Sequence, residues 1–524
     1  MERQQPSTAV GRDLLSILPG ERVSQGAADR LVYSRDMWPR ALLSVRDNKP
    51  SVHPPDYVVW PESTEEVAAV LRVAARHGVG VIPYGGGSGV CGGAMAMTGG
   101  VILDLKRMNH VLEVSASDHL ATFETGINGQ LLEDQLNLRG LTLGHFPASI
   151  YCSTLGGWLA ARSAGQLSSR YGKIEDMVHG LEVVLGDGRV VRCEHAHEPD
   201  LIPLFVGSEG TLGVITRATM RVNPLPDYRV FRAYEFPRVA AGCEAMRRTM
   251  QRGLQPAVMR LYDEVDTLLA RPSGDRPTTT KKRRGLLKAA LEAIPQMIPQ
   301  LGDALGGDLK GSLFRAALSH AGMLNKVVET FVPRLSGGCL AILGFEGEQA
   351  LVEAQAALGH AEYLGAGGRD LGEGPGLAWY KHRYSVSYKM SPVYANGGFV
   401  DTMEVATTWD RLMDLYREVR RALSPLAVVL AHFSHAYPEG CSIYFSFAAS
   451  AEGRVKSDAL YDEIWRTGLS AVLKAGGTIS HHHGVGQSKA AFMQEEHGAA
   501  MGVYRQLKAV MDPAGILNPG KMGL

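Results

Sequence analysis

The sequence predicts an α+β protein with two domains, and three observations support this prediction. Strand, helix and strand patterns alternate within residues 56–105, as they do in an α/β unit. Strand-like runs follow at 181–192 and 213–222, and helical and strand patterns alternate again between 227 and 490. The chain has 524 residues, which is too long for a single small core.

Capping and turn residues delimit the elements of the first domain. Ser63 and Glu66 match a capping box, and Gly78 follows the helical pattern that they open. Pro224 and Pro226 end the last strand pattern, and we place the domain boundary there. In chain order we expect a strand at 57–60, a helix at 65–77, strands at 79–84 and 101–105, a hairpin at 181–192 and a strand at 213–222.

The second domain is predicted from longer segments, and part of it is unusual. Residues 271–285 are basic and rich in turn formers, and 286–305 are amphipathic with two prolines. A solvated loop followed by a packed helix is one interpretation of 271–335; a lid or a contact with anionic lipid through 271–305 is the other. Elsewhere we expect helices at 239–252, 409–423 and 456–475 and strands at 339–346 and 441–448.

Composition excludes several classes of protein. Lys and Arg total 54 and Asp and Glu total 54, so no extended basic surface for nucleic acid is expected. The six cysteines show no metal-binding spacing and are expected to be reduced thiols. The N-terminus carries no apolar signal segment, and the longest charge-free stretch holds His145 and several glycines. We expect a cytoplasmic protein without a membrane span, with peripheral membrane contact and a homodimer left open.

The 61 glycines are the compositional outlier, and one group of them has a clear interpretation. Residues 85–93 read GGGSGVCGG directly after a predicted strand, and Gly87, Gly89 and Gly92 match GxGxxG. A dinucleotide fingerprint of that form should open a helix, whereas here AMAMTGG and another strand follow. We therefore reject the NAD interpretation. A glycine loop can still bind a diphosphate through successive backbone N–H groups, which we favour over a plain tight turn.

Two further loops carry the same composition. Residues 147–158 read PASIYCSTLGGW and residues 206–215 read VGSEGTLGVI. Each pattern alone is weak. Three such loops within about 130 residues, each beside a strand or a helix start, indicate one large ligand with diphosphate and ring moieties.

The order of these motifs resembles a known group. PYGGGSGV, PASIYCSTLGGW with YGKIEDMV, GSEGTLGVIT and the terminal ILNPGKM are similar to the vanillyl-alcohol oxidase/PCMH-type flavoproteins over residues 50–225 and the C-terminus. The resemblance implies an N-terminal extension (1–50), a two-subdomain FAD-binding domain (51–226), an α/β cap or substrate domain (227–490, with 271–335 as a lid or insertion) and a C-terminal segment (491–524) that returns to the FAD domain.

The same resemblance implies FAD as the cofactor and names its binding residues. The diphosphate loop holds no His, and Cys91 and Cys152 are interpreted as ordinary small residues, so noncovalent FAD is expected. The implied binding residues are Tyr84, Gly85, Gly86, Gly87, Ser88, Gly89, Val90, Pro147, Ala148, Ser149, Ser153, Thr154, Gly156, Gly157, Ser208, Glu209, Gly210, Gly213, Val214 and Ile215.

The second half carries four further motifs: RLYD at 260–263, MEVATTW at 403–409, CSIYFSF at 441–447 and SHHHGVG at 480–486. These motifs resemble the alkyldihydroxyacetonephosphate synthases more than the 2-hydroxy-acid dehydrogenases, which usually show an EHG-type motif where this chain reads HHHG. The resemblance implies catalytic roles for Arg260, Tyr444, His481, His482 and His483. By the same match Arg260 binds an anionic substrate group, with Lys389 nearby. Met390 departs from the family, which usually has an arginine there.

The residues themselves leave alternatives open. Three adjacent histidines could bind a metal, but no carboxylate or Cys lies at a useful spacing, so no metal is expected. A strand would place His481 and His483 on one face, and a packed structural role for some of them is an alternative. Tyr444 lies in a segment of alternating polarity that is typical of a strand, and its default interpretation is a core residue. A phenol can act as general acid or base only if a cation or a His lowers its pKa.

The resemblance implies the function. We expect an FAD-dependent enzyme that exchanges the acyl group of acyl-dihydroxyacetone phosphate for a long-chain alkoxy group through a flavin N5 adduct, in ether-lipid synthesis. The first alternative is an FAD-linked oxidase or dehydrogenase of a 2-hydroxy acid or alcohol. The second is a peripheral membrane or interaction protein with a vestigial flavin fold, which only the basic, amphipathic 271–305 segment supports.

Overall fold

The computed structural model describes residues 8–49, 53–195, 198–270, 318–319, 321–322, 325, 338–385 and 390–524. The chain folds into two compact units. The first unit comprises Met1–Gly165, Tyr171–Leu225 and His482–Leu524, and the second comprises Gln166–Arg170 and Pro226–His481. Most of 271–335, including the predicted lid or lipid contact at 271–305, lies outside the described residues, and so does Lys389.

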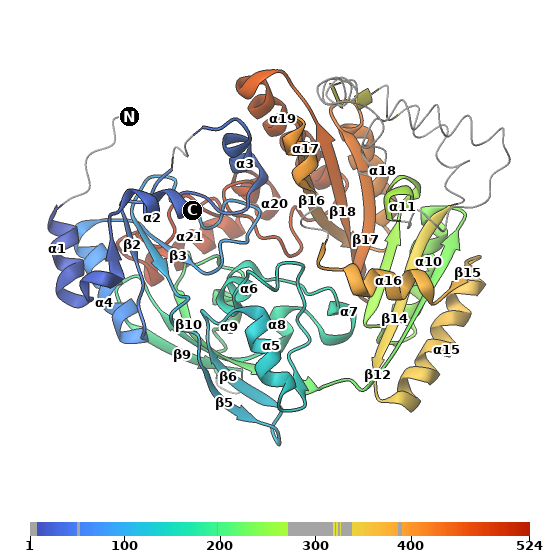
Figure 1. The fold of residues 1–524 in the computed structure, drawn as a ribbon, viewed down its shortest axis with the longest axis horizontal. Coiled ribbons are helices and arrows are strands. Elements are labelled where there is room, and N and C mark those ends of the chain that lie inside the picture. The colour runs from blue at the N-terminus through green and yellow to red at the C-terminus, as the bar shows by residue number, and fades with distance from the viewer. Residues whose placement is uncertain are drawn as a thin grey trace. The chain divides into compact units, whose positions relative to one another are not determined.

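The first unit begins with a four-stranded sheet of order β1-β2-β4-β3, in which β2, β4 and β3 are parallel and β1 is antiparallel (Figure 1). Residues 8–49, the described part of the predicted extension (1–50), add β1 to this sheet and pack the first helix against the helix that follows β2. The elements are α1 (Thr8–Ile17), β1 (Val23–Ser24), α2 (Ala27–Val32), α3 (Pro39–Arg46), β2 (Tyr57–Val59), α4 (Thr64–His77), β3 (Val81–Tyr84) and β4 (Val101–Asp104).

Helix α4 shows how local sequence sets its ends. The Ser63 hydroxyl accepts a hydrogen bond from the Glu66 amide at 3.2 Å, and Gly78 ends the helix in the left-handed conformation at φ 60°. The predicted capping box is only half present. The Glu66 carboxylate accepts from the Glu62 amide and from Arg22, because Arg22 is buried beside it and needs a counter-charge.

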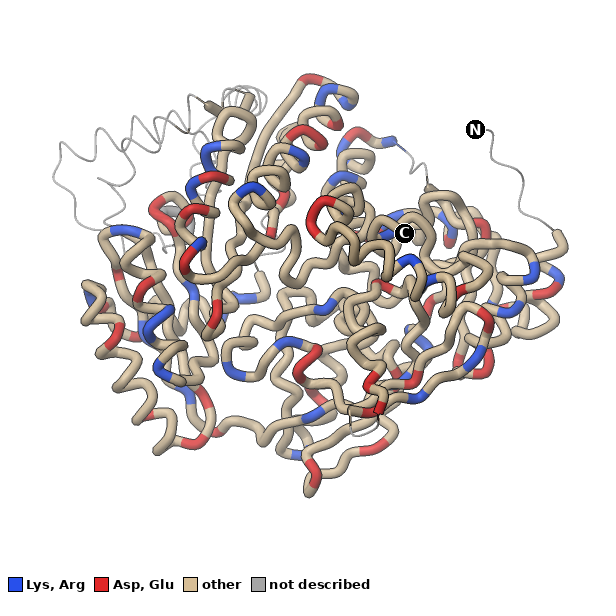
Figure 2. The backbone as a smooth tube through the Cα atoms, turned by 180° about the vertical axis from the view of Figure 1, so that it is seen from behind, with Lys and Arg blue, Asp and Glu red and all other residues tan. Residues whose placement is uncertain are grey.

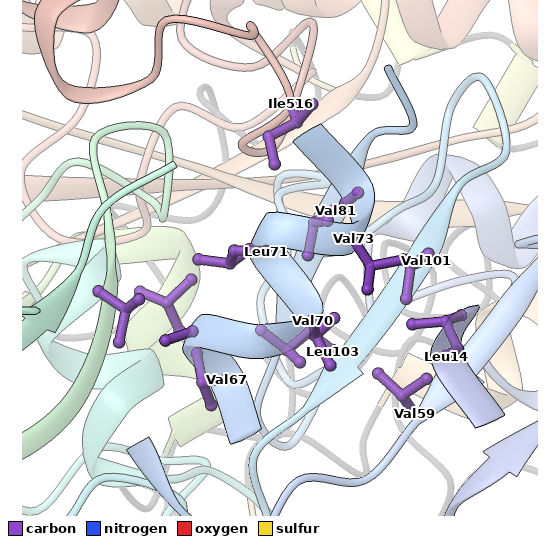
Figure 3. Close-up of a cluster of buried hydrophobic side chains, with 14 of the residues drawn as sticks. Leu14, Val59, Val67, Val70, Leu71, Val73, Val81, Val101, Leu103 and Ile516 are labelled. Carbon is purple, nitrogen blue, oxygen red and sulfur yellow. The ribbon is translucent and has the colours of Figure 1, made fainter. Parts of the chain in front are cut away.

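The core of this sheet is a mainly aliphatic cluster whose members come from both the N-terminal and the C-terminal parts of the sequence. Val67, Val70 and Leu71 follow the helical spacing i, i+3, i+4, so one stripe of α4 is apolar and faces the strands. Each such side chain contributes roughly 1.5–3 kcal/mol on full burial. Figure 3 labels ten members of the cluster: Leu14, Val59, Val67, Val70, Leu71, Val73, Val81, Val101, Leu103 and, from the C-terminal segment, Ile516.

A second, antiparallel sheet of order β5-β6-β10-β8-β9 follows in the first unit. Strands β8 and β9 form the hairpin predicted around Gly186–Gly188. The strands are β5 (Val111–Ser115), β6 (Leu120–Glu124), β8 (Val178–Val184), β9 (Val190–Glu194) and β10 (Val214–Arg221). Smaller elements of this unit are α5 (Gly129–Asn137), β7 (Leu141–Thr142), α6 (Leu155–Ala161), α8 (Ile174–Met177), α9 (Ile202–Phe205), β11 (Asn223–Pro224), α20 (Met493–His497) and α21 (Ala500–Met511). Helix α7 (Ser168–Tyr171) lies mostly in the Gln166–Arg170 segment of the second unit.

The second unit is built on a seven-stranded antiparallel sheet of order β15-β12-β14-β13-β17-β18-β16 (Figure 1). Its strands are β12 (Tyr228–Phe236), β13 (Val258–Tyr262), β14 (Cys339–Gly347), β15 (Arg369–Gly372), β16 (Phe399–Thr408), β17 (Val428–Ala436) and β18 (Gly440–Ala449). Its helices are α10 (Val239–Gln251), α11 (Glu264–Ala270), α15 (Gln349–Gly365), α16 (Gly374–His382), α17 (Ser391–Ala395), α18 (Leu412–Leu423) and α19 (Gly453–Lys474).

The two faces of this sheet differ in chemistry. Phe445 of β18 lies against Tyr416 of α18, and Phe447 lies against Trp465 of α19. Because side chains alternate along a strand, Tyr444 points to the opposite face. The helices α18 and α19 therefore cover an aromatic face and leave the other face for polar groups.

The predicted α+β fold is confirmed, and so are the predicted strands and helices within the described residues, with end shifts of a few residues. No helix follows the 85–93 loop before β4, which agrees with the rejection of a dinucleotide fingerprint. All six cysteines are described and none forms a disulfide. Within the described residues, no helix has the length and apolar character needed to cross a membrane. Figure 2 shows basic and acidic residues interspersed along the described chain.

Candidate functional site

The first glycine loop, residues 85–91, leaves β3 at Tyr84 and depends on glycine at particular positions. Gly87 has φ 62°, which disfavours other residues. A Cβ on Gly86 would lie 1.8 Å from the Cys152 carbonyl oxygen, and one on Gly85 would lie 2.2 Å from the Thr154 hydroxyl. A Cβ on Gly89 would meet nothing within 4 Å. The loop thus presses its first two residues against the second glycine loop and leaves Gly89 facing open space.

The second glycine loop, residues 147–160, is held by its own side chains. The Ser153 hydroxyl accepts from the Trp158 indole N–H at 2.8 Å and donates to the Ser149 carbonyl at 2.9 Å. Thr154 caps α6, accepting from the Gly157 amide at 3.4 Å. These serine and threonine side chains therefore shape the loop.

The third glycine loop, residues 207–215, contacts the second loop and strand β3, from which the first loop leaves. A Cβ on Gly210 would lie 2.9 Å from Pro83 of β3, and the Glu209 amide donates to the Ala160 carbonyl at 2.9 Å. Ser208 is buried, Gly213 packs against Val183 of β8, and Val214 and Ile215 are buried strand residues of β10. The structure thus brings the three predicted loops together within the first unit.

Glu209 links these loops to the C-terminal segment. It has φ 50°, which is unusual for a residue other than glycine, and its carboxylate accepts from the amides of Val485 and Gly486 at 2.5 and 2.7 Å. Burial raises the pKa of this carboxyl above its ordinary value. The Asn518 amide donates to the carbonyls of Glu209 and Gly93 at 2.7 and 2.9 Å. Through these hydrogen bonds Glu209 stabilises the conformation of the third glycine loop.

A buried histidine lies beside the second loop. His145 contacts the Trp158 ring at 4.7 Å, and its Nε2 lies 3.0 Å from the Ser163 hydroxyl. Its Nδ1 is buried and has no hydrogen-bond partner among the described residues. Burial, with His482 as a smaller cause, lowers the pKa of His145 to about 3. The ring is therefore neutral at physiological pH and keeps one nitrogen for a ligand.

In the second unit, strand register sets four side chains in one row, the polar row. Glu404 of β16 pairs with Tyr444 of β18, Tyr444 with His432 of β17, and His432 with Tyr262 of β13. Directly paired residues in antiparallel strands point to the same face. The polar row (Glu404, Tyr444, His432 and Tyr262) therefore lies on the face opposite α18 and α19.

Arg260 extends the polar row as a cation that has no directly bonded carboxylate among the described residues. Its Nη2 lies 2.6 Å from His432 Nε2, and His432 Nδ1 lies 3.0 Å from the Asp266 carboxylate. Arginine only donates, so Nε2 accepts and the ring proton sits on Nδ1. Burial and the Arg260 charge lower the pKa of His432 well below its ordinary value. Arg260 Nε is buried with no partner among the described residues, so the guanidinium is suited to an anion.

Tyr444 lies between two imidazoles. Its ring stacks on His432 at 4.6 Å, and its hydroxyl lies 3.3 Å from His435 Nε2. Burial raises the pKa of Tyr444 well above 10, Glu404 adds to the rise and Arg260 opposes it. The expected cation and histidine neighbours are present, but the pKa is not lowered, because desolvation outweighs them. Tyr444 is therefore a protonated phenol and a potential proton donor.

The three adjacent histidines do not form a strand. Residues 481–483 lie in a bend. His481 belongs to the second unit, where its amide donates to Glu404 at 3.0 Å and its Nδ1 lies 3.4 Å from the same carboxylate. His482 and His483 belong to the first unit and contact each other at 4.7 Å. Glu404 is distant in sequence, so spacing alone missed a carboxylate beside His481.

Sequence reasoning missed several members of this cluster: Ser168, Asp266, Glu404, His432, His435 and Tyr437. Only His432 and His435 carried a signal, as two histidines within one strand-like run. Met390 precedes α17, and its neighbour Lys389 lies outside the described residues, so the implied substrate contact of Lys389 stays a prediction.

Comparison with known proteins identifies the group to which these features belong. Residues 55–194 match the model of an FAD binding domain, and residues 225–522 match that of the C-terminal domain of FAD linked oxidases. The chain belongs to the FAD linked oxidase family. An alkyldihydroxyacetonephosphate synthase of Dictyostelium discoideum is 30% identical over 98% of this chain and 80% of its own length.

Solved structures agree with this assignment. A structure of alkyldihydroxyacetonephosphate synthase matches with a TM-score of 0.75 at 26% identity, over 99% of this chain and 87% of the other. Substrate-bound p-cresol methylhydroxylase matches with a TM-score of 0.71 at 16% identity, over 98% and 96% of the two chains. This flavoprotein thus has the PCMH-type fold, resembles the synthases, and uses FAD as its cofactor.

The first unit fits FAD. The first two glycine loops approach closely at Gly85 and Gly86, Gly89 faces open space, and His145 offers a buried nitrogen that has no partner among the described residues. Backbone amides of glycine loops bind diphosphate, and apolar and hydroxyl-bearing loops suit a flavin ring. Which of the twenty implied residues contact FAD, and whether FAD is noncovalent, stay predictions.

Proposed function

We propose that this protein is an FAD-dependent enzyme of the alkyldihydroxyacetonephosphate synthase type, which exchanges the acyl group of acyl-dihydroxyacetone phosphate for a long-chain alkoxy group. Arg260 is the observation that carries the proposal. Among the described residues its guanidinium contacts the neutral His432 and the ring of Tyr262 and forms no ion pair with a carboxylate, so it can bind the substrate phosphate without first breaking an ion pair. The whole-length similarity to synthases supports the same conclusion.

The residues of the polar row have separate tasks in this proposal. Asp266 fixes the His432 tautomer, and His432 orients the Arg260 guanidinium toward the phosphate. Tyr444 donates its proton to the departing carboxylate oxygen of the acyl group, and the proton of the incoming alcohol is released to solvent. His481, anchored on Glu404, contributes a further imidazole. When bound, FAD supplies the reactive ring that carries the group transfer.

An oxidase or dehydrogenase of a 2-hydroxy acid is the alternative that one observation favours. The chain matches a family model described as FAD linked oxidases, and Arg260 would suit a carboxylate as well as a phosphate. The two functions differ in redox balance, because acyl-to-alkoxy exchange has no net electron transfer and oxidation of a hydroxy acid reduces the flavin.

Anaerobic mixing separates the two functions. We expect acyl-dihydroxyacetone phosphate with hexadecanol to release fatty acid and form the ether product while the flavin stays oxidised at the end of turnover. Lactate and glycolate should leave the flavin spectrum unchanged. Full bleaching of the flavin by a hydroxy acid, with no fatty acid released from the ester, would overturn the synthase proposal in favour of the alternative.

A further inference from the structure

His435 occupies a backbone conformation that its residue type rarely adopts. Its φ is 52°, in the left-handed region, although it lies within β17. The pairing of β17 with β18 shifts there: Ser434 pairs with Ser442, Ala436 pairs with Cys441, and His435 is the extra residue. This is a β-bulge, a device that redirects a side chain at a cost in local strain.

The bulge decides what His435 can reach. In a regular strand, residues three apart point to opposite faces, so His435 would oppose His432. With the bulge, both imidazoles contact Tyr444, His432 by stacking at 4.6 Å and His435 through its Nε2 at 3.3 Å from the hydroxyl. A simple core histidine would not require this strained geometry.

The other ring nitrogen continues the contact. His435 Nδ1 lies 2.8 Å from the Ser168 hydroxyl, which lies 3.1 Å from the Tyr437 hydroxyl. His435 is buried, whereas Tyr437 is partly exposed. An unbroken series of hydrogen-bonding groups therefore runs from Tyr444 through His435 and Ser168 to a residue near solvent.

We propose that His435 is a positioning residue that relays a proton to Tyr444, an inference that rests on the proposed function. After the Tyr444 hydroxyl gives its proton to the leaving carboxylate, His435 Nε2–H transfers its proton to the phenolate oxygen. The Ser168 hydroxyl proton moves to Nδ1, the Tyr437 hydroxyl proton moves to Ser168, and water reprotonates Tyr437. One proton crosses each bond, and His435 ends neutral with its proton on the other nitrogen.

Other titratable groups face His435 and would respond to the same pH change. They are Tyr444 on β18, Tyr437 after β17, and His481, whose ring lies 5.7 Å away and which is anchored on Glu404 of β16. Ser168 approaches from α7. The pH profile of kcat for the wild type must therefore be compared with that of a His435 variant, so that the contribution of His435 is separated from those of its neighbours.

The test uses the complete FAD-loaded protein and the variant His435→Gly. Glycine accepts the left-handed φ, so this substitution removes the imidazole and keeps the bulge. We expect kcat for acyl-to-alkoxy exchange to fall about 100-fold, KM to change less than about twofold, and added imidazole to restore part of kcat. FAD content and the unfolding midpoint should match the wild type. Unchanged kcat, or a lowered kcat that imidazole does not restore, would contradict the relay.

Two further variants sharpen the result. His435→Gly combined with Tyr444→Phe should be no slower than Tyr444→Phe alone, since the imidazole acts through the phenol; additive losses would overturn the inference. His360→Gln is the matched control, because His360 Nδ1 lies 2.9 Å from Tyr234 in another histidine–tyrosine pair of the same unit, and it should leave kcat unchanged. If wild type instead bleaches with a hydroxy acid, the proposed function fails while the same variants, measured on flavin reduction, still test the relay.

Discussion

The glycine loops of the first unit and the polar row of the second unit are built in opposite ways. The loops depend on absent side chains, because a Cβ on Gly86 would lie 1.8 Å from a carbonyl oxygen. The polar row depends on present side chains, brought together from β13, β16, β17 and β18 by strand register. The loops are therefore sensitive to an added atom at Gly85 and Gly86, whereas the polar row is sensitive to the removal of a functional group.

The largest expected effect is at Gly86. The variant Gly86→Ala should yield protein that cannot retain FAD, because the new methyl group clashes with the Cys152 carbonyl and separates two loops. Gly502→Ala in α21 is the control, since a Cβ there meets nothing within 4 Å and alanine favours helix. Visible absorbance and FAD fluorescence after denaturation measure the loss. A yellow Gly86→Ala protein with full FAD would refute the loop assignment.

An intermediate effect is expected at Arg260. The variant Arg260→Gln should lower kcat/KM for the phosphate substrate by about 10²–10³-fold, because a desolvated charge on the anion is lost. Its FAD content should stay unchanged, in contrast to Gly86→Ala. Arg232→Gln is the control, since Arg232 forms a partly exposed ion pair with Asp370 at 3.0 Å and should alter kcat/KM less than about twofold. Equal kcat/KM of the two variants would show that Arg260 does not bind the substrate phosphate.

The smallest effect tests a side chain that supports a backbone in the first unit. Buried Glu133 accepts from the Thr142 hydroxyl at 2.8 Å and from the amides of Leu143 and Gly144 at 3.1 and 3.2 Å. Burial raises the pKa of Glu133 to about 7. The folded state holds this proton more tightly than the unfolded state does. The stabilisation that comes from protonated Glu133 is therefore complete below about pH 4.5 and is lost as the pH rises to about 7.

The variant Glu133→Gln removes that titration. Between about pH 4.5 and 7, wild type should lose about 3 kcal/mol of unfolding free energy that Glu133→Gln does not lose. Denaturant unfolding of both proteins across this range measures the difference. Identical pH dependence of the two unfolding free energies would show that the pKa of Glu133 is not raised in the folded state. Activity at neutral pH should change little, since no residue of the polar row contacts Glu133 among the described residues.

The sequence predicted the first unit better than the polar row. Ser63 and Gly78 mark the ends of α4 within a few residues, and the 85–93 loop was correctly separated from a helix-opening fingerprint. Glu404 and Asp266 were missed, because each reaches its histidine only through strand or helix placement. Arg260 and Tyr444 were found only through the family resemblance.

The sequence by itself determined the α+β fold, the elements and the glycine loops, because caps, turns and conformations that only glycine accepts are requirements of a few neighbouring residues. The tertiary structure alone decided that Tyr444 stays protonated, that His432 is neutral beneath Arg260, and that His435 turns toward Tyr444. Those properties depend on burial and on a one-residue bulge in pairing, and both arise from contacts between strands that local sequence does not specify.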